Sequence, residues 1–272
     1  MADLKCELYN DHFENAKTYG IPHAQLIIAD IPYNLGNNAY ASNPSWYVDG
    51  DNKNGESALA GKSFFDTDND FRIGNFFDFC TRYLKKEPKQ TNAAPAMIVF
   101  CSFEQMQMVI DEGKKHGLMK SYPLVFIKNF SAQVLKANMK IVGATEYAVV
   151  LYRDKLPKFR GGGKMVFNWF EWERDGADIP KIHPTQKPVK VLKRLIEIFT
   201  DVGDVVIDPC AGSGSTLRAD AELNRNAYGF EIKKDFVRDA KEKMLKACQP
   251  DFFSTLEWEA KQEEKEKYRK AE

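Results

Sequence analysis

The feature that most constrains this chain is a regular alternation of short apolar runs with segments of helical periodicity. The runs expected to form strands are Leu4–Tyr9, Gln25–Ala29, Ala96–Cys101, Leu124–Ile127, Tyr147–Tyr152, Asp204–Ile207 and Ala227–Glu231. The segments expected to form helices are Phe13–Tyr19, Gly74–Lys86, Phe103–His116, Pro188–Phe199, Thr216–Leu223 and Lys234–Ala247. This alternation predicts an α/β fold, with a mostly parallel sheet of seven strands and helices on both faces.

Two segments interrupt the pattern, and a third follows it. Residues 35–70 are rich in Asn, Gly, Ser and Asp, and include Tyr40 and Trp46. Residues 155–180 begin with basic residues and three glycines and continue with Phe167, Trp169, Phe170 and Trp172. Loops of this length are usually functional or disordered. We therefore expect one domain over residues 1–250 that contains both segments, followed by a charged tail, 251–272.

The composition excludes several classes of protein. The 272 residues carry 39 Lys and Arg against 39 Asp and Glu, but residues 120–194 alone hold 15 basic and six acidic side chains. One basic region in a neutral protein is suited to nucleic-acid phosphates, although an uneven surface is an equally good interpretation. The five cysteines and four histidines lack metal-ligand spacing, and no stretch is apolar enough to cross a membrane. We expect a cytoplasmic protein without a metal.

The first block with chemical potential is Ala29-Asp30-Ile31-Pro32-Tyr33-Asn34, which follows an apolar run. Pro32 cannot continue a sheet ladder, so the chain must leave the sheet there. Asp30 is thereby expected at the carboxyl end of a buried strand, where α/β sheets bind their ligands. A carboxylate accepts from N–H groups, and the ring of Tyr33 can stack on a planar base. A strand-ending turn with a solvated Asp is the alternative.

The second block runs from Val205 to Thr216 and reads as a buried strand, a glycine-containing turn and a helix. Glycines there let a ligand approach the main chain closely. The block lacks the glycine spacing of a dinucleotide site and the Lys of a P-loop, so a nucleoside ligand without a diphosphate is favoured. Glu231 ends the next expected strand, where an acid can bind ribose hydroxyls. Tight packing of strand against helix is the alternative.

The third block, His183-Pro184-Thr185-Gln186-Lys187-Pro188, precedes an amphipathic helix. Thr185 is a plausible N-cap, and Pro188 suits the first helical turn. Lys187 is unfavourable there, because a cation opposes the positive end of the helix dipole. Its position is understandable if it binds an anion such as a carboxylate. A solvated lysine is the alternative.

In this order the three blocks resemble the motifs of the β-class amino-methyltransferases of DNA, which modify N6 of adenine or N4 of cytosine. The likeness covers nearly all of residues 4–247, and His183 to Pro188 match their motif completely. The resemblance implies a Rossmann-like, circularly permuted methyltransferase fold, DNA as substrate and S-adenosyl-L-methionine as cofactor. It also implies base flipping, since the amino group is inaccessible within a duplex. Related enzymes are often dimers, so a homodimer is possible.

Site residues follow from the resemblance position by position. The catalytic block would be Asp30, Ile31, Pro32 and Tyr33. Cofactor contacts would come from Asp11, Asp30, His183, Thr185, Lys187, Asp208, Pro209, Ala211, Gly212, Ser213, Gly214, Ser215, Glu231 and Ile232. Asp11 would receive the cofactor's adenine amino group, Glu231 would hold the ribose, and Thr185 and Lys187 would bind the carboxylate.

Two departures from the family motifs have consequences. Ile31 replaces the first proline of the catalytic motif, which predicts reduced rigidity but retained chemistry, because the position contributes a backbone carbonyl. Cys210 replaces an aromatic residue beside the cofactor, so another side chain must fill that space.

The residue type at position 30 also helps to choose among the alternative substrates. An Asp at position 30 favours N6 of adenine, since N4-cytosine enzymes often carry Ser there and enzymes that methylate protein amides carry Asn. N4-cytosine methylation is the second choice, followed by the protein amide and by a DNA-binding protein without activity.

We expect DNA contacts from the two irregular segments, namely from Lys155, Lys158, Arg160, Lys164, Tyr40 and Trp46, and also from Trp169 and Trp172. Burial of the 167–172 aromatics in the core is the alternative.

Overall fold

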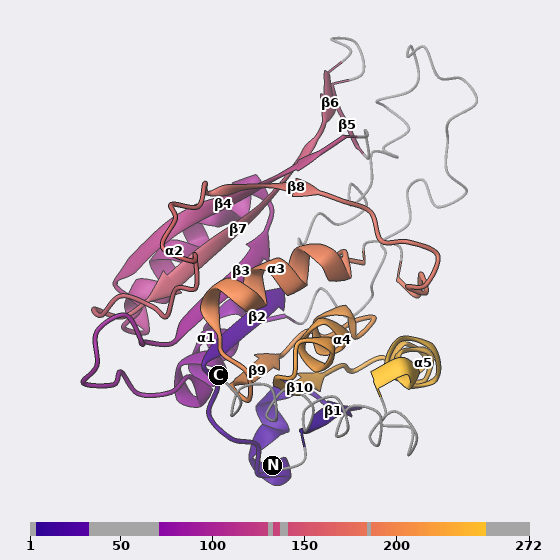
Figure 1. The fold of residues 1–272 in the computed structure, drawn as a ribbon, viewed down its shortest axis with the longest axis horizontal. Coiled ribbons are helices and arrows are strands. Elements are labelled where there is room, and N and C mark those ends of the chain that lie inside the picture. Colours follow the sequence, from indigo (N-terminus) through magenta and orange to yellow (C-terminus); the bar gives the residue numbers. More distant parts are fainter. Residues whose placement is uncertain (1–3, 33–70, 130–132, 137–140, 184–185, 249–272) are drawn as a thin grey trace, which may run out of the picture.

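The computed structural model describes residues 4–32, 71–129, 133–136, 141–183 and 186–248. Figure 1 shows a central twisted sheet with helices packed against it. The strands are β1 (Cys6–Tyr9), β2 (Leu26–Asp30), β3 (Ala96–Cys101), β4 (Lys120–Lys128), β7 (Thr145–Tyr152), β8 (Trp169–Trp172), β9 (Val205–Asp208) and β10 (Asn226–Phe230). A separate antiparallel pair consists of β5 (Gln133–Lys136) and β6 (Ile141–Gly143). The helices are α1 (Ile73–Tyr83), α2 (Met106–Lys115), α3 (Val189–Phe199), α4 (Ser215–Glu222) and α5 (Lys234–Asp239).

The sheet has eight strands in the order β1-β10-β9-β2-β3-β7-β4-β8 rather than the expected seven. Strand β7 is antiparallel to both β3 and β4, and the other strand pairs of this sheet are parallel. The chain enters at the edge strand β1 and reaches the central strand β9 only late, which is the permuted order that the family resemblance implies. The additional strand is β8, which alternates outward and inward side chains along the open edge of β4.

Burial on both faces explains why the central strands read as continuous apolar runs. Along β2, Leu26 and Ile28 pack with α3 and α4 in one apolar cluster. Ile27 and Ala29 face the other way and pack with α1 in a second cluster. The two clusters hold β2 between helical layers, so its end, Asp30, is fixed in position.

Some helices are shorter than the sequence predicts. The segment expected as one helix from Lys234 to Ala247 is divided into α5, a π-helical stretch and a final 3-10 turn. Phe13–Tyr19 is a 3-10 helix. Helix α1 ends at Tyr83 because the next residue, Leu84, forms a bridge with Ala24.

Candidate active site

The carboxyl ends of four neighbouring strands meet at one edge of the sheet (Figure 1). The register pairs Ile27 with Ile207, Asp208 with Gly229, and Phe230 with Tyr9. Asp30, Asp208 and Glu231 therefore lie at the same edge, as the sequence predicts. Parallel α/β sheets bind ligands there, because the chain leaves the sheet in loops that diverge.

Asp30 is paired with Lys187. The Lys187 Nζ atom lies 2.6 Å from Asp30 Oδ2, and the lysine side chain is only 9% exposed. Burial alone would lower the pKa of Lys187, but the carboxylates of Asp30 and Glu146 raise it above its usual value. The ammonium is therefore charged, and it donates directly to the carboxylate at the end of β2.

This contact adds to the role predicted for Lys187. The sequence assigns Lys187 to a cofactor carboxylate, whereas the structure places it on the predicted catalytic Asp30. An ammonium has three N–H donors, so one contact does not exclude another. The position of Lys187 in the sequence predicts an anion partner. Asp30, in the same chain, is such a partner.

The backbone after Asp30 is held by a residue that the sequence reasoning missed. Gln105 Nε2 donates to the Pro32 carbonyl at 2.9 Å, and Gln105 Oε1 accepts from Ser102 N at 3.1 Å. Ile31 is buried, and its N–H donates to the Phe100 carbonyl at 3.2 Å. These bonds stiffen the segment in which Ile31 replaces the family proline. The Ser-x-x-Gln spacing of a capping box was the available signal. Tyr33 lies outside the described residues.

Asp208 is the most deeply buried acid of the glycine-containing turn. Its side chain accepts from Cys210 N at 2.9 Å and from the Thr216 side chain. Burial raises the pKa of Asp208 to about 7, and these hydrogen bonds only partly oppose the shift. Asp208 therefore holds the turn through hydrogen bonds from within the protein and does not present a solvated charge.

Glu231 closes the same turn from the neighbouring strand. Its Oε2 accepts from Gly212 N at 2.9 Å and its Oε1 from Lys233 N at 2.7 Å. Burial raises the pKa of Glu231, and the backbone hydrogen bonds act in the opposite direction. Gly212 and Gly214 have φ values of 50° and 76°, which favour glycine. The Ile232 N–H also bonds to this carboxylate, which has about four lone-pair sites, so a site remains for a ligand hydroxyl and the residues are suited to a ribose-bearing ligand.

The other residues predicted around the cofactor lie near this turn. Pro209, Ala211, Ser213 and Ser215 belong to the turn and the start of α4 and are buried or nearly so. Ser213 Oγ and Ser215 Oγ are 2.9 Å apart. The side chain of Ile232 is exposed, and its carbonyl accepts from Asn10 Nδ2.

Asp11 lies at the same edge, but its carboxylate has local partners. It accepts from His12 N, Asn15 Nδ2 and Tyr19 Oη, each at 2.7 Å. The last two hydrogen bonds lower the pKa of Asp11, so the group is ionised. The contact with a cofactor amino group stays a prediction, and the structure adds that Asp11 also anchors the 3-10 helix.

The third block is arranged differently from the expectation. Helix α3 begins after Pro188, and the Val189 and Lys190 N–H groups are accepted by the Asp175 carboxylate at 3.0 and 3.3 Å. Asp175 thus supplies the cap that the sequence reasoning gave to Thr185, which lies outside the described residues. The Gln186 amide also bonds within the chain, to Ile182 N and the Pro180 carbonyl, and so fixes the turn before Lys187.

His183 is neutral in this environment. Burial and the charges of Lys187 and Lys233 lower its pKa to about 4. Its ring meets Phe236 edge-on at a centroid distance of 4.8 Å. An uncharged His183 avoids adding a third positive charge beside Lys187.

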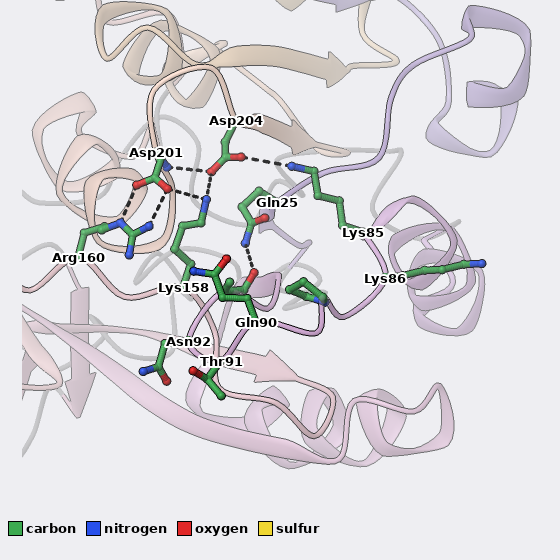
Figure 2. A pocket seen from close by; sticks show the side chains of 12 residues that line it. Gln25, Lys85, Lys86, Gln90, Thr91, Asn92, Lys158, Arg160, Asp201 and Asp204 are labelled. Carbon is green, nitrogen blue, oxygen red and sulfur yellow. Dashed lines mark hydrogen bonds and ion pairs between the residues drawn. The ribbon is translucent and has the colours of Figure 1, made fainter.

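The basic residues predicted to contact DNA are largely committed to the fold. Lys158 Nζ lies 2.5 Å from Asp204 and 2.8 Å from Asp201, and Arg160 pairs with Asp201 through two hydrogen bonds. Figure 2 shows these groups in a pocket of about 620 Å³ that Gln25 also lines. Gln25 directly precedes β2, so the pocket lies at the end of the sheet opposite to Asp30.

Lys158 and Arg160 are both held by carboxylates of the chain itself, and their contact with phosphate stays a prediction. Lys155 is held too, since its Nζ donates to the Pro88 carbonyl and its N–H to Glu87. Lys164 is exposed and remains available for such a contact. Tyr40 and Trp46 lie outside the described residues.

The aromatic cluster is divided between core and surface. Trp172 is buried and Phe170 packs against the same core, whereas Trp169 and Phe167 are 43% and 74% exposed. The two exposed rings stack on each other with centroids 5.9 Å apart. The strand periodicity of β8 explains this, because alternate side chains point to opposite faces. Trp172 is thus a core residue and not a DNA contact.

Comparison with known proteins identifies the family. The family model described as DNA methylase matches residues 24–242, well over half of the chain. The chain belongs to this family of N6 and N4 DNA methyltransferases. The DNA adenine methyltransferase YhdJ of Escherichia coli K12 is 25% identical over 256 residues, which cover 87% of this chain and 81% of that protein. The Type II methyltransferase M.MjaI of Methanocaldococcus jannaschii is 28% identical over 170 residues, 54% of this chain and 56% of that protein.

Solved structures show the same fold. The M1.HpyAVI–SAM complex has a TM-score of 0.64 at 19% identity, covering 88% of this chain and 98% of that one. The cytosine-N4-specific PvuII DNA methyltransferase has a TM-score of 0.63 at 14% identity, covering 88% and 86%. The expected methyltransferase fold is confirmed. As a member of the DNA methylase family, the chain uses S-adenosyl-L-methionine as its methyl donor.

Two further findings concern other classes of site. Among the described residues, no cluster of three or more His, Cys, Asp or Glu side chains is placed to bind a metal ion. None of the helices in the described ranges combines the length and apolar character of a membrane-spanning segment.

Proposed function

We propose that this DNA methyltransferase modifies the N6 amino group of adenine after the base has left the duplex. The observation that carries the proposal is the carboxylate of Asp30, held at the end of β2 by Lys187. The resemblance associates Asp at this position with adenine and Ser with N4 of cytosine. The similarity to a named adenine methyltransferase over most of the chain supports the same choice. The fold does not distinguish the two, since a cytosine-N4 enzyme shares it.

The residues around Asp30 have distinct tasks in this reaction. Asp30 accepts one hydrogen of the amino group, and the contact with Lys187 orients the carboxylate. A backbone carbonyl accepts the second hydrogen. The Pro32 carbonyl already accepts from Gln105, which favours that of Ile31. With both hydrogens held, the nitrogen lone pair points toward the methyl group, and catalysis rests on positioning and preorganised dipoles.

The cofactor would be held along the carboxyl edge. It supplies a methyl group on a positively charged sulfur. The turn from Asp208 to Gly214 would surround its methionine end, Glu231 would bind the ribose hydroxyls and Asp11 the adenine. Lys187, which is in contact with Asp30, would also reach the cofactor carboxylate. Thr185 and His183 belong to the same proposed contact.

The deciding experiment identifies the methylated nucleoside. Purified protein is incubated with isotope-labelled S-adenosylmethionine and DNA of mixed sequence, and the digested nucleosides are separated by mass. We expect labelled N6-methyladenine. Labelled N4-methylcytosine would replace the proposal by its alternative, and label on protein in place of DNA would contradict both.

For DNA contacts we propose the loop 35–70 together with Lys164 and the exposed stack of Phe167 and Trp169. The support is composition and exposure: a cation for phosphate, and aromatic faces for unstacked bases.

A further inference from the structure

We propose that Glu146 is a positioning residue for methyl transfer, which acts by holding Lys187 against Asp30. The inference rests on the proposed role of Asp30. Glu146 belongs to none of the sequence blocks that carry the resemblance. The spatial arrangement of four charged side chains is what assigns it this task.

Four charged side chains form a charge chain, Asp30–Lys187–Glu146–Lys128. Lys187 Nζ is 2.6 Å from Asp30 and 3.9 Å from Glu146 Oε2. The other Glu146 oxygen, Oε1, lies 2.5 Å from Lys128 Nζ. Negative and positive groups thus alternate over three contacts, so each inner charge has an opposite charge on either side.

Three members of this charge chain are largely buried. The side chains of Glu146, Lys128 and Lys187 are 19%, 10% and 9% exposed. Charges removed from water are costly unless they are paired, and removing one partner leaves the other uncompensated. The chain of four therefore behaves as a unit, in which a change at Glu146 is felt at Lys187.

Two aromatic rings, Trp172 and Phe100, lie beside the lysines and form an aromatic wall. Trp172, from the edge strand β8, has Lys128 Nζ 5.0 Å and Lys187 Nζ 6.0 Å from its ring centroid, and Lys187 also lies over Phe100 at 5.5 Å. These rings confine the ammonium groups and favour positive charge. A lysine stem is flexible, with four carbons. The aromatic wall and Glu146 together restrict Lys187 to the position from which it donates to Asp30.

This arrangement predicts a specific kind of dependence. Glu146 is two contacts away from the proposed amino group, so its removal should slow methyl transfer without changing how DNA binds. Its effect should also require Lys187. A residue that only stabilised the sheet would act regardless of which side chain occupies position 187.

The test is a double-mutant cycle with Glu146→Gln, Lys187→Gln and the double variant. Glu171→Gln is the matched control, because it removes the same charge from an exposed position on β8. Three quantities are measured: the urea midpoint of the cofactor-free protein, kcat, and KM for DNA. We expect Glu146→Gln to lower kcat about tenfold with KM changed less than about threefold, as for a lost charge-assisted contact. In the Lys187→Gln background, the same change should have little further effect on kcat, whereas the urea midpoint should still fall somewhat because Lys128 loses its partner.

Several results would overturn the inference. One is a normal kcat in folded Glu146→Gln, and another is additive effects of the two substitutions on kcat. A loss of stability with unchanged kcat would show a structural role alone. If Lys187→Gln is too slow to measure or does not fold, Glu146→Asp replaces it: the retained charge should restore most of kcat, and failure to do so contradicts the proposal. If the unmodified protein methylates no DNA, the proposed function fails, while the urea cycle still tests the Glu146–Lys187 pair.

Discussion

The predicted catalytic carboxylate depends on its neighbours more than the sequence suggests. Asp30 is held by Lys187, and the peptide after it is held by Gln105. Both partners come from segments distant in the chain, and both limit the freedom of the site before any ligand arrives. Preorganisation of this kind lowers the cost of reaching the transition state.

We expect Asp30→Ala to abolish methyl transfer while cofactor affinity stays within about tenfold, because the carboxylate acts on the amino group in the transition state. Single-turnover assays and calorimetric titration with S-adenosylmethionine measure the two effects. The matched variant Asp30→Asn keeps the shape and removes the charge. Near-normal turnover of either variant would remove Asp30 from the catalytic role.

Gln105 offers a second prediction for a single residue. Gln105→Leu removes the donor to the Pro32 carbonyl and the acceptor for Ser102 N, so the segment that carries Ile31 loosens. We expect kcat to fall about tenfold, the equivalent of about one hydrogen bond, with cofactor affinity unchanged. Gln107→Leu, two residues along and exposed, is the control. An unchanged kcat would show that Ile31 needs no support.

His183 predicts a pH dependence of stability. Its folded-state pKa, about 4, lies below the unfolded value of 6.5, so the unfolded chain binds more protons between these limits. The contribution of His183 to stability is therefore complete above about pH 6.5 and decreases as the pH falls toward 4, by at most roughly 3 kcal/mol. Asp208, with a raised pKa, acts in the opposite direction.

Urea unfolding of wild type and His183→Gln at about pH 7 and about pH 4.5 separates the two groups, because Asp208 is common to both proteins. Wild type should lose stability relative to the variant on acidification. Parallel curves would show that His183 titrates normally.

At the scale of elements, β8 lies within the irregular segment 155–180 and contacts the charge chain through Trp172, whose ring lies beside Lys128 and Lys187. One face of this strand enters the core through Phe170 and Trp172, and the other presents Trp169. One face of this four-residue edge strand is thus part of the core, and the other is exposed to solvent. The division explains how aromatic residues two positions apart have different roles.

The prediction for β8 compares its two tryptophans. Trp172→Ala should lower the free energy of unfolding by about 3–5 kcal/mol, because it leaves a cavity beside Phe126. Trp169→Ala should change stability little and, together with Phe167→Ala, should weaken DNA binding. Urea denaturation and DNA titration by fluorescence anisotropy measure the two quantities. Equal destabilisation by both tryptophan substitutions would contradict the inward and outward assignment.

At the scale of the whole molecule, the two ends of the sheet have different tasks. The carboxyl edge gathers Asp30, Asp208 and Glu231, whereas Lys158 and Arg160 form ion pairs with Asp201 and Asp204 at the amino end. A base that reaches Asp30 must approach the first edge. At the amino end, these ion pairs join the segment after β7 to the loop before β9.

This separation predicts different consequences for neighbouring basic residues. Lys158→Met should lower the free energy of unfolding by about 1–3 kcal/mol, because Asp204 loses a buried charged partner. The slope of log DNA affinity against log salt should stay the same. Lys164→Ala should leave stability unchanged and reduce that slope by about 0.9, the value for one phosphate contact. A reduced slope in Lys158→Met would return this residue to the DNA surface.

The sequence determined the features that depend on local pattern. The apolar runs located every strand of the central sheet except β8, because burial on both faces leaves a continuous apolar run. The position of Asp30, Asp208 and Glu231 at one edge followed from their places at strand ends, since parallel strands align their carboxyl ends. Motif order was enough to indicate the family and the cofactor. Strand β8 was missed because four residues are too few to separate strand from helix periodicity.

Tertiary structure decided the partners of the charged side chains. Nothing local connects Lys187 with Asp30 and Glu146, or Lys158 with Asp204, because these pairs come from strands and loops far apart in the chain. Whether a lysine binds a carboxylate of its own chain or an external anion depends on which charges the fold brings within about 4 Å, where a low-polarity environment strengthens the attraction. For that reason the same basic composition produced a contact with the proposed catalytic carboxylate at Lys187 and a contact at the opposite end of the sheet at Lys158.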